Sequence, residues 1–384
     1  MITDAAGWPV LEVSRLYNIE PQGLGTPLVE CLAGYVVRLA MAHLVSARNL
    51  TKYVKSTYQS NTYLIPDNRL IISDKTMSSM NGCNSSAEAW VDALEQLTLR
   101  NDLRRLTLLP FSHMFSDKNL VKTFRRWCPS CLDEWLSNGL TLYEPLLWCI
   151  NMIKICPLHH EPIASSCPHC GHRSLHILPC TQPGFCSHCN GWLGRTTTIK
   201  QGIGDNEYQI WAGREIGELL ASNSLENSAT SESLPTVLDY LIKKRTKRDG
   251  ILLTSKLINV SPKRLREWLD GERVPELHNL LRLCWLFKLK LVELETLEGC
   301  CEKSDGFDER IADASYEISQ GRSKIDWMKI EKLLLNIISG EVAPMRVVDI
   351  ARINDCFPAQ IYRRYSDLCK TISKNRTRNS PFWG

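Results

Sequence analysis

The chain has 384 residues, enough for two or three domains of roughly 100–200 residues each. Its 43% hydrophobic and 23% charged residues are ordinary for a globular protein and exclude a wholly disordered or collagen-like chain. The net charge of +4 does not by itself indicate a nucleic-acid-binding protein. Residues 1–9 lack a basic start and an apolar core, and no stretch reaches the roughly 18 uninterrupted apolar residues of a membrane helix. We therefore expect no secretory signal, no membrane contact and a cytoplasmic location.

The N-terminal region, residues 1–126, is predicted to be helical. Apolar residues recur at helical spacing in residues 30–40, and Asn84 can cap a second helix that runs through Leu97. Residues 56–83 are rich in Ser and Asn, which is typical of a loop. The compact apolar run 103–110 closes this region.

Residues 127–200 carry four pairs of metal-ligand residue types, each pair separated by two residues. The pairs are Cys128 and Cys131, Cys156 and His159, Cys167 and Cys170, and Cys186 and Cys189. Without an export signal the thiols are expected to be reduced, and paired cysteines then indicate a metal site. Two ligands two residues apart can share one tight turn, and two such turns supply the four corners of a tetrahedron around Zn²⁺.

Grouping the pairs in chain order predicts two structural zinc ions. The first would be held by Cys128, Cys131, Cys156 and His159, and the second by Cys167, Cys170, Cys186 and Cys189. The fifteen residues between Cys170 and Cys186 match the spacing of four-cysteine zinc sites. Interleaved pairing of the turns and replacement of His159 by His160 remain open. Disulfides would need an oxidising compartment, and a catalytic zinc would need an open coordination position.

The C-terminal part is predicted to hold two helical bundles. A helix near 208–220 and a polar linker make up residues 201–235, followed by a first bundle at 236–299 and a second at 300–384 with a basic tail. Residues 236–274 contain ten Lys and Arg against five Asp and Glu, and residues 344–384 contain eight against three. The rest of the chain therefore carries a net charge of −6, which suggests two anion-facing surfaces, although solvated helix faces would look the same.

Each bundle contains a candidate helix-turn-helix. In the first, a helix over 252–258 and a turn at 259–261 precede a helix over 262–270, with Ser261 as its N-cap and Gly271 at its end. This places Leu265 and Trp268 inside, and Lys263, Arg264 and Glu267 outward, where such helices contact nucleic acid. The second candidate joins helices at 347–353 and from Pro358 onward, with outward residues Gln360, Arg363 and Arg364 and more buried residues Ile361, Tyr362, Tyr365 and Leu368. Docking of either helical unit on a protein partner is the alternative.

Several of these segments, in this order, resemble the TniQ family. The resemblance is carried by residues 103–110, 126–131 and 143–148, Cys156 to His159, and Cys167 to Gly171. It covers roughly residues 20–220, with looser similarity beyond. Cys31 stands where family members usually carry Ser at the start of the first helix.

The resemblance implies a target-selection protein of a DNA transposon, which links a target recogniser to the AAA+ ATPase regulator TnsC. The recogniser is expected to be a CRISPR effector complex with its guide RNA, with DNA and a second copy of the chain as further candidate partners. The alternative is a sequence-specific DNA-binding protein of the TnsD type that selects an attachment site, or a helix-turn-helix regulator. An enzyme is not expected, because the sequence has no HExxH motif, no P-loop and no acidic cluster beside the cysteines.

These inferences predict a mainly α, multidomain chain. It would consist of a helical N-terminal region, a central zinc-ribbon or knuckle region with short β-hairpins, and C-terminal helix-turn-helix bundles.

Overall fold

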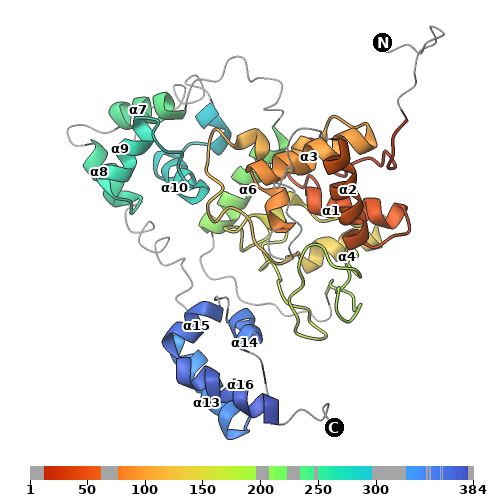
Figure 1. Cartoon of the computed structure of the whole chain (residues 1–384). Helices are drawn as coiled ribbons and strands as arrows, with labels where there is room; N and C mark the ends of the chain where they lie inside the picture. The colour runs from red at the N-terminus through yellow and green to blue at the C-terminus, as the bar shows by residue number, and fades with distance from the viewer. Residues whose placement is uncertain are drawn as a thin grey trace, which may run out of the picture. The chain divides into compact units, whose positions relative to one another are not determined.

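The computed structural model describes residues 13–61, 77–195, 207–222, 234–245, 250–295, 326–342, 345, 347–354, 356 and 358–378. The chain divides into two compact units, Met1–Ser315 and Tyr316–Gly384. The fold is mainly helical, as predicted, and the β-structure found among the described residues consists of isolated bridges (Figure 1). No helix in these ranges is long and apolar enough to cross a membrane. Of the predicted loop at 56–83, residues 62–76 lie outside the described residues, whereas residues 56–61 and 77–81 are helical and correct the prediction. Residues 300–320 of the predicted second bundle also lie outside the described residues.

Three helices build the N-terminal part of the larger unit: α1 (Leu32–Ala42), α2 (Ala47–Asn61) and α3 (Ser85–Thr98). Asn84 caps α3 as predicted, since its side-chain oxygen accepts hydrogen bonds from the amides of Ser86 and Ala87. Cys31 caps α1 with its sulfur, which accepts from the Gly34 amide at 3.2 Å. The thiol thus makes the contact that a serine hydroxyl makes at helix N-caps.

Helix α2 was not predicted from the sequence. Its buried residues, Ala47, Leu50, Val54 and Tyr58, recur every three or four positions, but polar residues outnumber them. Three short 3-10 helices, η1 (Met77–Asn81), η2 (Leu103–Leu106) and η3 (Leu109–Phe111), connect this part to the rest of the unit.

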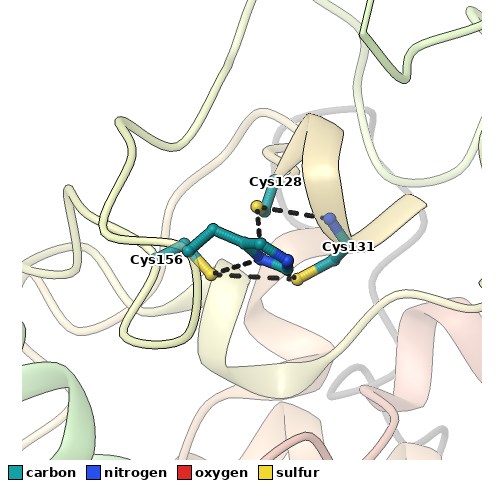
Figure 2. A group of neighbouring side chains, drawn as sticks. Cys128, Cys131 and Cys156 are labelled. Atoms are coloured by element: carbon teal, nitrogen blue, oxygen red, sulfur yellow. Dashed lines mark hydrogen bonds between the residues drawn. The ribbon is translucent and has the colours of Figure 1, made fainter. Parts of the chain in front are cut away.

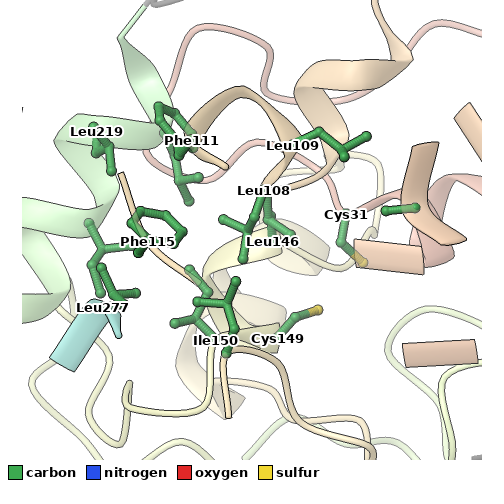
Figure 3. Packing of buried hydrophobic residues seen from close by; sticks show 14 of the residues in the cluster. Cys31, Leu108, Leu109, Phe111, Phe115, Leu146, Cys149, Ile150, Leu219 and Leu277 are labelled. Carbon is green, nitrogen blue, oxygen red and sulfur yellow. The ribbon is translucent and has the colours of Figure 1, made fainter. Parts of the chain in front are cut away.

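The main apolar core of the larger unit contains residues from Leu16 to Leu294, and a smaller separate cluster surrounds the cysteines of residues 127–193. It includes α6 (Glu207–Ala221), α7 (Leu234–Arg245), α8 (Gly250–Leu257), α9 (Pro262–Leu269), α10 (Leu277–Phe287) and η4 (Leu291–Glu295). Figure 3 shows Phe115 between Leu219 of α6 and Leu277 of α10, beside residues from the N-terminal part. The first predicted helix-turn-helix bundle and the N-terminal helices therefore share a core.

The smaller unit has its own core. Helices α13 (Trp327–Ser339), α14 (Val347–Ile353), α15 (Pro358–Arg364) and α16 (Ser366–Arg378) pack around Ile330, Ile350 and Ile361. The helix boundaries at 347–353 and from Pro358 agree with the prediction. The expectation that Tyr362 is buried was wrong, because its side chain is exposed.

A buried ion pair joins the N-terminal helices to the cysteine-rich region. The guanidinium of Arg125 contacts the Glu144 carboxylate at 2.5 and 2.6 Å, with side-chain exposures of 3% and 7%. Nη2 of Arg125 also donates to the Gln182 carbonyl, and Nη1 donates to the Phe185 carbonyl and the Ser187 hydroxyl. The backbone of Glu144, in turn, accepts from the Cys31 amide at 2.8 Å. One arginine thus holds together three segments that are distant in sequence.

The charge of Glu144 is maintained despite complete burial. Burial raises the pKa of this carboxyl, but the charge of Arg125 and the hydrogen bond with His176 outweigh it and lower the pKa below its usual value. A carboxyl whose pKa is lowered on folding stabilises the fold above its unfolded-state pKa. That contribution is lost as the pH falls through the folded-state pKa.

Removing the cation of this pair should destabilise the larger unit strongly. Arg125→Met leaves the Glu144 carboxylate buried without its partner, so we expect the free energy of unfolding to fall by about 3–5 kcal/mol. The control Lys243→Met breaks an exposed pair with Asp239, four residues away on α7, and should cost less than about 1 kcal/mol. Urea denaturation followed by circular dichroism measures both variants. Equal losses would contradict the role assigned to Arg125.

Candidate metal centres and nucleic-acid interface

The first group of predicted ligands converges in the larger unit. Cys128 and Cys131 lie at the N-terminus of α4 (Pro129–Ser137), and Cys156 and His159 lie on the turn that faces it. Their ligand atoms all lie within 4.8 Å of one another, so this group can hold a metal ion. Figure 2 shows the thiols of Cys128, Cys131 and Cys156 pointing toward one another.

The distances in this first centre match the edges of a tetrahedron. With Zn–S of about 2.3 Å and Zn–N of about 2.0–2.1 Å, these edges measure about 3.8 Å between sulfurs and about 3.5 Å between sulfur and nitrogen. The sulfurs of Cys131 and Cys156 are 3.8 Å apart. His159 Nδ1 lies 3.5, 3.3 and 3.6 Å from the sulfurs of Cys128, Cys131 and Cys156. These four distances are compatible with a tetrahedral metal ion between the ligand atoms.

Neighbouring groups hold the first centre in this geometry. The other ring nitrogen of His159, Nε2, contacts the Glu134 carboxylate of α4 at 2.9 Å. A carboxylate in this position fixes the ring orientation and leaves Nδ1 as the ligand atom. The Cys131 amide donates to the Cys128 sulfur at 3.5 Å, and the N-terminus of α4 favours negative charge on both thiolates.

The second group, Cys167, Cys170, Cys186 and Cys189, also lies within 4.8 Å and can hold a metal ion. Cys167 and Cys189 are 3.6 Å apart between sulfurs, and Cys170 and Cys186 are 3.8 Å apart. These distances again match tetrahedral edges and are far longer than a disulfide bond of about 2.05 Å. All eight cysteine and histidine side chains predicted as ligands therefore fall into the two groups expected from chain order.

Three of the four ligand pairs lie on the same kind of turn. After each pair comes a residue with positive φ: His160 at 54°, Gly171 at 69° and Asn190 at 56°. The amide of that residue donates to the carbonyl of the first ligand of its pair, at 2.8–2.9 Å. The pair Cys128 and Cys131 differs, because Cys128 is the N-cap of a helix. The expectation that each ligand pair lies on a tight turn is therefore confirmed for three of the four pairs.

The close spacing of the thiols in the first group opposes their joint ionisation. The hydrogen bond to Cys131, the contact with Cys156 and burial raise the pKa of Cys128. Hydrogen bonds from Cys128 and Cys131 lower the pKa of Cys156. A proton shared among closely spaced sulfurs explains the opposite directions, and a divalent cation would replace it.

Neither His160, the alternative to His159, nor the remaining cysteine of this region, Cys180, belongs to the two ligand groups. His160 contacts Arg214 at 3.3 Å, and Cys180 is exposed and belongs to neither group. His176, a further histidine of this region, is buried, and its Nδ1 lies 3.7 Å from the Glu144 carboxylate. A further close group joins Cys170 to His172 and His188, whose rings stack at 3.8 Å.

The predicted nucleic-acid residues occupy two helices in different units. On α9, Lys263 is exposed, whereas Arg264 and Glu267 are half-buried, so the expectation that all three point outward was correct only for Lys263. Arg266, which the sequence analysis passed over, is exposed on the same helix three positions after Lys263. Helical spacing from Lys263 is the signal that indicates it.

On α15, Gln360, Arg363 and Arg364 are exposed as expected. Arg364, however, stacks over the rings of Trp327 at 5.2 Å and Tyr365 at 5.9 Å. The cation–π contact of Arg364 with Trp327 therefore holds α15 against α13, and this guanidinium is only partly available to a ligand.

Comparison with known families gives one match: residues 21–163 match the TniQ family model. These residues form a TniQ domain. The TniQ domain spans α1 to α5 (Leu146–Cys149) and contains all four side chains of the first metal centre, while the second centre follows it in the chain. The family resemblance inferred from the sequence is confirmed over this segment. At the level of the family, a TniQ domain implies a role in target selection for DNA transposition. The chain matches none of the curated proteins with which it was compared.

Each metal centre should lose its ion independently when one ligand is removed. We expect two equivalents of metal in the protein purified with zinc, and one in Cys156→Ser or in Cys186→Ser, because three ligands bind structural zinc far more weakly than four. Cys180→Ser is the matched control, since this exposed thiol lies in the same region outside both groups. Elemental analysis gives the count. Two equivalents in Cys156→Ser would refute the assignment of the first centre.

Glu134 should affect the metal affinity of the first centre and not that of the second. We expect Glu134→Ala to weaken metal binding there by about tenfold, because His159 loses the carboxylate that orients it. The second centre contains no histidine ligand and should keep its affinity. Competition with a chromophoric chelator resolves the two affinities. If Glu134→Ala weakened both centres equally, a general loosening of the fold would explain the effect better.

Proposed function

We propose that this protein is a non-enzymatic adaptor in DNA transposition. It would link a target recogniser, an RNA-guided CRISPR effector complex, to the AAA+ regulator TnsC and so direct insertion. The observation that carries this proposal is the TniQ domain over residues 21–163. The location is proposed to be the cytoplasm, and an environment that keeps thiols reduced fits the free cysteines of the described residues.

Two structural zinc ions are proposed as the cofactors. Thiolate-rich donor sets with tetrahedral spacing favour zinc over oxygen-preferring cations such as Mg²⁺ or Ca²⁺. The ions would cross-link a region of turns whose own apolar cluster is small, and structural zinc can contribute roughly 10 kcal/mol to such regions. Four protein ligands at each ion would leave no position for a substrate, which supports the non-enzymatic assignment.

The layout that we propose follows the ligand groups and helices. It comprises a helical N-terminal region (1–126), a double zinc region with knuckle turns and short hairpins (127–200), a helix with linker (201–235), and two helix-turn-helix bundles (236–299 and 300–384). Lys263, Arg264, Gln360, Arg363 and Arg364 are proposed to contact nucleic acid, together with Arg266.

A second candidate function is direct recognition of an attachment site on DNA. The observation that favours it is α9, which has a Ser261 cap, a buried Leu265 and Trp268, and exposed Lys263 and Arg266. This is the arrangement of a recognition helix that enters the major groove. The adaptor assignment remains our first proposal because the TniQ domain covers the larger part of the described N-terminal fold.

Reconstitution separates the two functions. The full chain would be mixed with the AAA+ ATPase and the guide-loaded effector complex encoded beside it, and the assemblies analysed by size-exclusion chromatography with mass measurement. We expect an adaptor to bind each partner separately and to bring them into one assembly, and the mass also reports whether two copies of the chain are present. Selective binding to one DNA sequence, with no binding to the effector complex, would support the attachment-site function instead. No binding to the ATPase would refute the adaptor.

A further inference from the structure

A cavity of about 430 Å³ lies beside α9, where the helix faces the N-terminal part of the larger unit. Ser116, Asp117 and Lys118 form one wall of the cavity, and residues of α9 and of the segment that precedes α10 form the other. The two walls are fixed together, because the Ser116 amide donates to the Pro275 carbonyl at 2.9 Å. Lys118 belongs to the TniQ domain, whereas α9 lies about a hundred residues beyond its end.

Three cationic side chains line this cavity: Lys118, Arg264 and Arg273. Arg264 projects from the first turn of α9 and is half-buried. Its guanidinium makes no hydrogen bond or close ion pair with the described residues, although its charge interacts with the Glu276 carboxylate. A half-buried guanidinium without a hydrogen-bond partner favours an anionic ligand in the space that it faces.

The other two cations have carboxylate partners that are much less exposed than the cations themselves. Lys118 pairs with Glu276 at 2.8 Å, with side-chain exposures of 62% and 14%. Arg273 pairs with Glu267 at 3.2 Å, with exposures of 65% and 17%. The remaining acid, Asp117, accepts hydrogen bonds from the Cys83 amide and the Asn84 side chain. In both ion pairs the cation is therefore the partner that reaches solvent.

If α9 entered the major groove of DNA, a phosphate backbone would run past these cations. A recognition helix in the major groove, which is about 12 Å wide, has a phosphate backbone along each flank. Residues on one side of the helix, and those of the segment packed against that side, then face phosphates. Arg264 and Arg273 flank α9 on the side that the segment carrying Lys118 covers.

We propose that this cavity receives a backbone phosphate of duplex DNA, held by Lys118, Arg264 and Arg273. This inference rests on the proposed DNA-facing role of α9 and extends it, because Lys118 makes the TniQ domain part of the DNA interface. Contacts of this kind contribute affinity and orientation without sequence preference.

The test measures binding of the full chain to a labelled duplex by fluorescence anisotropy, between about 50 and 200 mM salt. We expect Lys118→Ala and Arg273→Ala each to weaken binding about three- to tenfold and to lower the salt slope by about one. Glu276→Gln should tighten binding, because it removes a negative charge from the same wall. Lys52→Ala is the matched control, an exposed lysine of α2 in the same unit outside the cavity. Circular dichroism checks that each variant is folded.

The experiment distinguishes failure of the cavity inference from failure of the proposed DNA-binding role of α9. If Lys263→Ala and Arg266→Ala weaken binding while Lys118→Ala and Glu276→Gln leave it unchanged, α9 binds DNA and the cavity inference is wrong. If the wild-type chain does not bind duplex DNA, both the role of α9 and the cavity inference fail. Displacement of the duplex by inorganic phosphate at the same concentration of phosphate groups would assign the cavity to a free anion and overturn the inference.

Discussion

The fold of the larger unit depends on one buried arginine. Arg125 neutralises Glu144, and it also satisfies two carbonyls and a hydroxyl from the turns around the second metal centre. Neither partner could remain charged at this depth alone, because the desolvation of an unpaired ion costs several kcal/mol. The adjacent Arg126 donates to the carbonyls of Trp148, Ile150 and Ile153 and fixes the segment that leads into the first centre. Both ligand groups are thereby attached to the N-terminal helices.

The predictions from the sequence were most accurate for features formed by residues that are close together in the chain. Each ligand pair is contained in four residues, so its spacing alone determined which side chains share a turn, and chain order grouped the pairs correctly. Helix caps are also local: Asn84 and Ser261 were predicted to begin α3 and α9, and each accepts the hydrogen bond of a cap. The helices at 347–353 and from Pro358 followed from the same kind of signal.

Features that depend on distant segments were not accessible from the sequence. The role of Arg125 requires Glu144 and Gln182 to be adjacent, and no local pattern indicates this. Burial of His176 follows from the same packing. Arg264 was placed on the outer face of α9 because helical spacing puts it there, but the segment around Ser116 covers that side of the helix. In each case a contact with a distant segment determines the burial and the partners of the side chain, which the local helix or turn does not specify.

The backbone hydrogen bond between Ser116 and Pro275 has a mechanical consequence. It joins the segment after α9 to the N-terminal part of the larger unit, and α9 shares an apolar core with that part. Movement of α9 away from the segment around Ser116 would break this bond and expose apolar side chains of the shared core.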